Sequence, residues 1–205
     1  MDLSEADLVE LDRTAVREAV RVVDLAGEDD WERDSPCAGW TLRRLVAHMT
    51  AQHHGFTAAA RGEGQDAARW REPRDMSEPA ETHRAAAASV LDAFGEPGSV
   101  GREFALPELG GSFPGRRAVG FHLVDYVAHA WDVAATLGLR VRLPEDVLGA
   151  ALAIARRVPA DPALRGPGFA FAPVVRAPEK AEGSGPLEET LRLLGRRPER
   201  WPVRE

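Results

Sequence analysis

The sequence predicts an all-α fold, a four-helix bundle with one long crossover connection and a short, less regular C-terminal appendage. Long segments place their apolar residues at helical steps of three and four, and stretches rich in Gly and Pro separate these segments. A chain of 205 residues, 44% of them hydrophobic, can bury a core within one domain. We therefore expect residues 1–158 to form the bundle and residues 159–205 to form an extension that packs on it.

The first two helices have clear start signals. Ser4 and Asp7 match a capping box ahead of a helix that we expect over residues 5–25. Thr41 is the expected N-cap of a second helix, which covers LRRLVAHMTAQHHGFTAAA and turns its apolar residues inward. His48 lies beside that apolar face.

The next two helices flank the crossover. Residues 61–79 are expected to form a loop, and an Ala-rich helix follows over residues 79–94. Residues 99–117 show little helical period and should form an extended crossover with at most a short strand. A fourth helix is expected over residues 117–137, closed by Gly138.

Two shorter helices complete the predicted fold. Pro144 opens a fifth helix, PEDVLGAALAIARRV, which has acidic residues in its first turn and arginines in its last. Beyond Pro159 the chain is rich in Pro and Gly until LEETLRLLGRRPERW, which predicts a short amphipathic closing helix.

The fourth helix carries an unusual polar face, formed by His122, Asp125, His129, Asp132 and Thr136. These residues follow one another at steps of three and four, so they line one side of a helix that is otherwise mostly apolar. A polar face of this width could simply meet the solvent. Solvent-facing sides, however, are built mostly from Lys, Arg and Glu, and this one has none. Buried His and Asp need polar partners or a metal ion, so this polar face is a candidate site.

A metal site can be assembled from this polar face and the second helix. Asp125 and His129, four residues apart, can point at one ion, and His48 can face the same point from the second helix. Two imidazoles and one carboxylate leave coordination positions open for water, thiol or substrate, as catalytic sites do. The same ligands also suit non-haem iron, and a lone histidine such as His48 is more often a core or surface residue.

Two segments, SPCAGWTLRRLVAHMTAQHHGF and FHLVDYVAHAWDVAATLG, resemble the signature regions of the DinB-like superfamily, in its mycothiol-dependent maleylpyruvate isomerase-like branch. The resemblance covers roughly residues 5–155. It implies a DinB-like four-helix bundle in which His48, Asp125 and His129 bind a divalent metal ion, most often zinc. It also implies mycothiol, or another low-molecular-weight thiol, as a cosubstrate.

Two departures from the family pattern bear on the reaction. The isomerase of this family carries Glu where this chain has the shorter Asp125, and it has a full second domain in place of residues 159–205. Both departures argue against maleylpyruvate isomerisation itself. The predicted function is a divalent-metal-dependent isomerase or thiol S-transferase, in which the metal activates a low-molecular-weight thiol towards a small electrophilic substrate. A metal-hydroxide hydrolase or lyase, and a non-catalytic small-molecule binding protein, stay open as alternatives.

Other polar residues near these motifs have predicted roles. Asp132 could hold the imidazole of His129 from behind, or it could be an ordinary surface or capping carboxylate. His122 could be a fourth metal ligand, a catalytic base or a wall of the pocket, and the role predicted for it is catalytic. His53 should border the cavity, and His54 should be exposed.

Cys37 is the only cysteine, so the chain has no internal disulfide and no CxxC metal motif. Its place just before a helix could lower the pKa of the thiol, but a small apolar residue in a connecting loop is the simpler interpretation. Arg116, Arg117 and Arg176 could bind a substrate carboxylate, although solvation at the surface is again simpler.

Charge and composition limit the classes of partner that we expect. A net charge of −7 disfavours nucleic acid and anionic lipid. The segment MDLSEADLVELD lacks the apolar run of a signal peptide, and nowhere do about 18 apolar residues follow one another. We expect a cytoplasmic protein that acts on a small molecule and binds neither nucleic acid nor membranes. Homodimer formation stays open.

Overall fold

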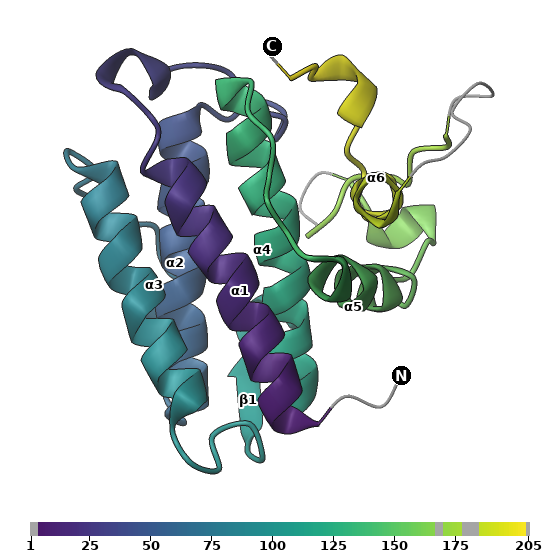
Figure 1. Ribbon diagram of the computed structural model, residues 1–205. Helices are drawn as coiled ribbons and strands as arrows, with labels where there is room; N and C mark the ends of the chain where they lie inside the picture. Colours follow the sequence, from purple (N-terminus) through teal and green to yellow (C-terminus); the bar gives the residue numbers. More distant parts are fainter. Residues whose placement is uncertain (1–3, 167–169, 178–184, 204–205) are drawn as a thin grey trace.

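The helical fold is confirmed by a computed structural model, which describes residues 4–166, 170–177 and 185–203. Four long helices run side by side (Figure 1). Helix α1 packs against α4, and α2 packs against α3. The four helices are α1 (Glu5–Val23), α2 (Leu42–Ala60), α3 (Pro79–Gly95) and α4 (Gly115–Leu137).

The helix starts agree with their sequence signals. Ser4 and Asp7 form the predicted capping box: the Asp7 amide donates to the Ser4 hydroxyl at 3.1 Å, and the Ser4 amide donates to the Asp7 carboxylate at 3.2 Å. Thr41 caps α2 by accepting from the Arg44 amide at 3.4 Å. Residues 1–3, the first residues of the segment MDLSEADLVELD, lie outside the described residues.

The crossover contains a small hairpin, so the prediction of at most one short strand was wrong. Strand β1 (Glu103–Leu106) pairs antiparallel with β2 (Gly111–Pro114), and Phe104 lies opposite Phe113. Between the strands the chain turns at Gly110, whose φ of +74° favours glycine. Each strand has only four residues, which is too short for an alternating pattern to be recognised in the sequence.

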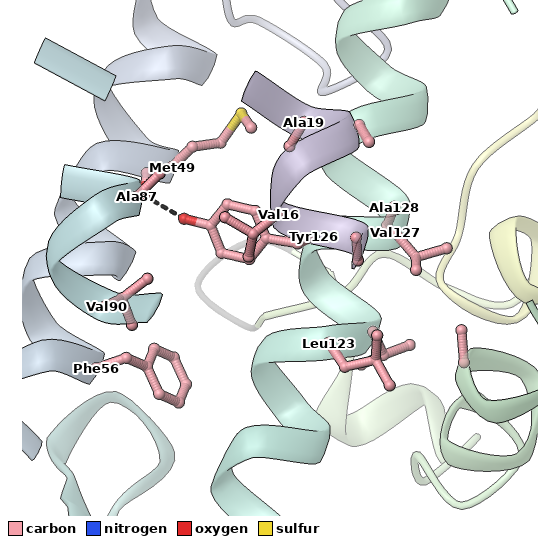
Figure 2. Close-up of a cluster of buried hydrophobic side chains, with 14 of the residues drawn as sticks. Val16, Ala19, Met49, Phe56, Ala87, Val90, Leu123, Tyr126, Val127 and Ala128 are labelled. Atoms are coloured by element: carbon pink, nitrogen blue, oxygen red, sulfur yellow. Dashed lines mark hydrogen bonds between the residues drawn. The ribbon is translucent and has the colours of Figure 1, made fainter. Parts of the chain in front are cut away.

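The bundle core is closely packed around the ring of Tyr126. Figure 2 shows aliphatic side chains of α1 and α4 beside the ring of Tyr126, with Met49 and Phe56 on the α2 side. Tyr126 is fully buried, and its hydroxyl donates to the backbone carbonyl of Met49, so its polar end is satisfied within the core. This bond ties α4 to the middle of α2.

The C-terminal part lies along one side of the bundle (Figure 1). The predicted fifth helix is present as α5 (Glu145–Ala155), with Pro144 as its N-cap residue, but it ends before the arginines that were expected in its last turn. It contacts α1 and α4. Helix α6 (Pro186–Leu193) packs on α5. The division into domains at residue 158 stays a prediction. Within the described ranges, no helix combines the length and the apolar composition that a membrane span needs.

Two glycines in helices should respond oppositely to alanine. A Cβ added at Gly55 in α2 would lie 2.1 Å from the buried ring of Trp70, whereas one added at Gly149 in α5 would meet nothing within 4 Å. We expect G55A to lower the free energy of unfolding by about 3 kcal/mol through overpacking. G149A should raise it by about 0.5–1 kcal/mol, since alanine loses less backbone entropy. Urea denaturation checks both values, and a G55A protein as stable as wild type would contradict this packing.

Candidate metal centre

The polar face of α4 is directed into the protein. His122, Asp132 and Thr136 are fully buried, and His129 is only 4% exposed. Asp125 is the most open of the five, with 24% of its side chain exposed. The interpretation of this face as an ordinary solvent-facing side is therefore wrong. These polar groups are buried and must be satisfied by other side chains or by a ligand.

Three side chains from α2 and α4 converge on one point. The ligand atoms of His48, Asp125 and His129 all lie within 4.8 Å of one another. The rings of His48 and His129 meet edge to face at a centroid distance of 5.5 Å. The Nε2 atom of His129 lies 3.4 Å from Oδ1 of Asp125. The structure thus brings together the three residues that the sequence predicted as metal ligands.

The spacing of these donors suits a small divalent ion. Two ligands bound to zinc at about 2.0–2.1 Å in tetrahedral geometry lie roughly 3.3 Å apart. The 3.4 Å between His129 and Asp125 is close to this value. Nitrogen and carboxylate donors are also the types that zinc takes. The residues present therefore fit a zinc ion, with coordination positions left over.

The protonation of the two histidines differs. Burial, followed by the charge of His129, lowers the pKa of His48 to about 4, so this imidazole is neutral near pH 7 and free to act as a ligand. Burial alone would also lower the pKa of His129. The charge of Asp125 and the hydrogen bond to Asp132 outweigh burial and raise the pKa of His129 to about 10. A metal ion would take the place of the proton that His129 holds in the metal-free protein.

Asp132 lies behind His129, on the side away from Asp125. One of its carboxylate oxygens lies 3.0 Å from Nδ1 of His129. Since this carboxylate is an acceptor, Nδ1 carries the proton, and Nε2 is left facing Asp125 and His48. Histidine ligands of metals usually have such a partner on their other nitrogen. The role of Asp132 as the partner of a metal-bound histidine stays a prediction.

A second set of candidate ligands shares His129. The ligand atoms of Cys37, His129 and Asp132 also lie within 4.8 Å of one another. The thiol of Cys37 donates to Asp132 at 3.3 Å, and the guanidinium of Arg196 lies 2.8 Å from the same carboxylate and 3.9 Å from the sulfur. A cation placed among these atoms would be repelled by the guanidinium charge. The His48 set is therefore the better metal site.

One end of the site is bordered by an aromatic residue. The ring of Trp40 lies 4.9 Å from that of His48, and the guanidinium of the exposed Arg44 lies 4.9 Å from the Trp40 ring. Trp40 belongs to the turn that precedes α2. Because this turn also carries Cys37, one short segment supplies two neighbours of the site.

His122 belongs to a different group of side chains. It lies seven residues before His129, or about 10 Å along the helix axis. Its fully buried ring contacts Asp12 through Nδ1 at 2.7 Å and His53 through Nε2 at 3.2 Å. The structure does not bring His122 to the candidate metal ligands, and its catalytic role stays a prediction.

This inner group, Asp12, His53, His83 and His122, takes one residue from each helix of the bundle. All four side chains are fully buried. His53 and His83 stack at a centroid distance of 5.0 Å, and neither ring nitrogen of His83 has a hydrogen-bond partner among the described residues. His53 was predicted to border the cavity, but it lies in the core.

The remaining predicted residues lie outside the site. His54, Arg116 and Arg176 are exposed, as is Arg117, whose guanidinium lies over the rings of Phe113 and Phe121. Thr136 donates to the backbone carbonyl of Asp132.

Sequence reasoning missed Asp12, His83 and Arg196. A signal for the first two was present, because Asp12 falls in the apolar helical register of positions 8, 15 and 19, and His83 in that of positions 87, 90 and 94. A charged or polar residue inside an apolar register predicts a buried polar group. Arg196 had no such signal, since it lies in a charged segment typical of solvated surface.

Fold and site together define a class of protein, a four-helix bundle with a histidine and carboxylate cluster between two of its helices. Residues 13–134 match the family described as the mycothiol maleylpyruvate isomerase N-terminal domain, and the chain belongs to this family. The predicted resemblance is confirmed.

Similar proteins support this assignment. Two uncharacterized proteins of Mycobacterium tuberculosis, from strains CDC 1551 and H37Rv, are each 30% identical over 168 residues, covering 79% of this chain and 82% of the relative. Among solved structures, mycothiol-dependent maleylpyruvate isomerase matches with a TM-score of 0.57 at 20% identity. A variant of it with a histidine replaced by alanine matches with a TM-score of 0.59 at 17% identity. Both matches cover 75% of this chain and 70% of the other, and at such identities they show the fold alone.

Proposed function

We propose that this protein is a divalent-metal-dependent enzyme of the isomerase or thiol S-transferase type, which uses mycothiol or a similar low-molecular-weight thiol on a small electrophilic substrate. The observation that carries the proposal is the convergence of His48, Asp125 and His129 within 4.8 Å, from two helices of the bundle. Membership in the mycothiol maleylpyruvate isomerase N-terminal domain family supports the choice of thiol chemistry.

The donor set indicates a catalytic rather than a structural metal site. Structural zinc sites are usually closed by four protein ligands, whereas two imidazoles and one carboxylate leave a position for an exogenous ligand. When bound, zinc would supply Lewis acidity that lowers the pKa of a thiol or water molecule. Asp125 and His48 are only partly buried, whereas His129 is buried, so the first two mark the side from which small molecules reach the site.

The chain's own thiol does not supply the nucleophile. Cys37 donates its thiol proton to Asp132. Burial and the neighbouring carboxylate raise the pKa of Cys37, so this sulfur stays protonated and weakly nucleophilic near pH 7. Thiol chemistry at this site therefore requires an external thiol. In a transfer reaction its sulfur bonds to the electrophilic carbon and the leaving group departs with its electron pair; in an isomerisation the same bond forms and then breaks, returning the thiol.

Zinc analysis and thiol dependence test the proposal. We expect purified protein to carry, or to take up from added zinc, about one ion per chain. Electrophilic substrates such as unsaturated carbonyl compounds should turn over only when mycothiol or a surrogate thiol is present. Protein that neither carries zinc nor takes it up would refute the metal site. Zinc-dependent turnover that needs no thiol would favour the alternative hydrolase or lyase that uses water.

A further inference from the structure

An arginine from the C-terminal segment reaches into the candidate metal centre. Nη2 of Arg196 lies 2.8 Å from Oδ2 of Asp132, and its Nε lies 3.4 Å from Oδ1. The guanidinium therefore faces both carboxylate oxygens. Only 11% of the Arg196 side chain is exposed, and Asp132 is fully buried. A buried carboxylate of this kind needs a paired cation, because removal of either partner leaves an uncompensated charge in the interior.

The backbone around Arg196 fixes this contact. Gly195 has a φ of +85°, and a Cβ on it would lie 2.6 Å from Ala172. The turn therefore requires glycine. The nearly buried Arg165 donates to three backbone carbonyls, those of Pro159 at 2.7 Å, Ala172 at 3.0 Å and Leu193 at 2.8 Å. Arg165 thus ties the end of α6, just before the Gly195 turn, to the segments around Pro159 and Ala172, and these contacts fix the position of Arg196.

Because Asp132 also contacts His129, the arginine restrains the orientation of this imidazole through the carboxylate. The carboxylate oxygen that Arg196 contacts at 2.8 Å is the one that lies 3.0 Å from Nδ1 of His129. Without Arg196 the carboxylate could turn away from the imidazole, and the ring would then be free to rotate. With Arg196 in place the carboxylate is held, and Nε2 of His129 stays directed towards Asp125.

We propose that Arg196 is a positioning residue of the metal centre, which holds Asp132 against His129 and so sets the affinity for the metal. This inference rests on the proposed function. It assigns to the C-terminal segment a part in the site, although none of its residues belongs to the converging ligand set. Arg196 contacts neither metal nor substrate in this role.

A double-mutant cycle on zinc affinity tests the proposal. Dissociation constants are measured by chelator competition for wild type, R196M, D132N and the double variant. We expect R196M to weaken zinc binding about tenfold, within the 10–100-fold range known for the outer partners of metal ligands. The double variant should bind zinc no more weakly than D132N, because Arg196 acts only through Asp132. Additive losses, or unchanged affinity in R196M, would overturn the proposal.

Matched variants separate positioning from a general loss of structure. R197M alters the neighbouring exposed arginine and should keep wild-type affinity. A merely structural Arg196 would lower the melting temperature of the metal-free protein without changing the dissociation constant. If R196M does not fold, R196K provides the same comparison: it keeps the charge but not the two-point contact, so reduced affinity supports the proposal and unchanged affinity refutes it. Wild-type protein that binds no zinc would instead refute the proposed function.

Discussion

Replacement of His129 by alanine should abolish high-affinity zinc binding. The residue offers Nε2 to the site and belongs to both candidate ligand sets. Loss of an outer partner alone costs 10–100-fold, so loss of a ligand should cost more than about 100-fold in zinc affinity. Chelator competition gives the dissociation constant, and elemental analysis gives the stoichiometry. H54A, which removes an exposed histidine of α2, should bind zinc as wild type does.

Two further variants decide which ligand set is used. D125N removes the carboxylate that only the His48 set contains, and C37S removes the thiol that only the other set contains. We expect D125N to lose zinc and C37S to retain it. The reverse result would place the ion between Cys37 and Asp132. Wild-type affinity in H129A would exclude both sets.

Acidification should strongly destabilise the metal-free protein. Burial lowers the pKa of His53 well below the ordinary value of 6.5 and lowers that of His83 to about 3. Both rings are neutral when folded, whereas the unfolded chain takes up protons below pH 6.5. Their contribution to stability is therefore complete above pH 6.5 and is lost as the pH falls towards the folded pKa values. At pH 5 the loss is about 2 kcal/mol for His83, and His53 adds to it in the same direction.

The variant H83L isolates the contribution of His83 to this pH dependence. Urea denaturation in EDTA at pH 7.5 and pH 5 gives the two free energies of unfolding without a contribution from metal loss. In H83L the difference between them should shrink by about 2 kcal/mol. At pH 7.5 the variant should be close to wild type in stability, because neither nitrogen of His83 has a partner among the described residues. E81Q, on the exposed side of α3, is the control, and an unchanged pH dependence in H83L would contradict this account.

Helical periodicity and capping signals were sufficient to predict the bundle. Steps of three and four identify an inward side for each helix, and residues such as Ser4, Thr41 and Gly138 mark the ends. The same reasoning placed Asp125 and His129 on one face. It failed for the hairpin at Gly110, where pairing between two four-residue strands, and not local pattern, makes the structure.

The rest of the site depends on which elements face one another, and periodicity does not contain that information. His53 has an inward position that suits either the metal centre or the core, and only the packing of α2 against its neighbours places it beside His122. The contact of Arg196 with Asp132 joins a turn after α6 to the C-terminal part of α4. Neither segment carries a local signal for the other, because the contact is made by tertiary packing alone.

The contacts of the Asp132 carboxylate should form one after another as the protein folds. Its pair with His129 spans three residues and forms with the helix, whereas its contacts with Cys37 and Arg196 span 95 and 64 residues. Closing such long loops is entropically costly, and it slows the contacts that depend on it. During synthesis Arg196 also emerges 64 residues after Asp132. Under the proposals made above, a nascent chain that lacks Arg196 therefore binds zinc about tenfold more weakly, and full affinity for the ion is reached only after the C-terminal segment has docked.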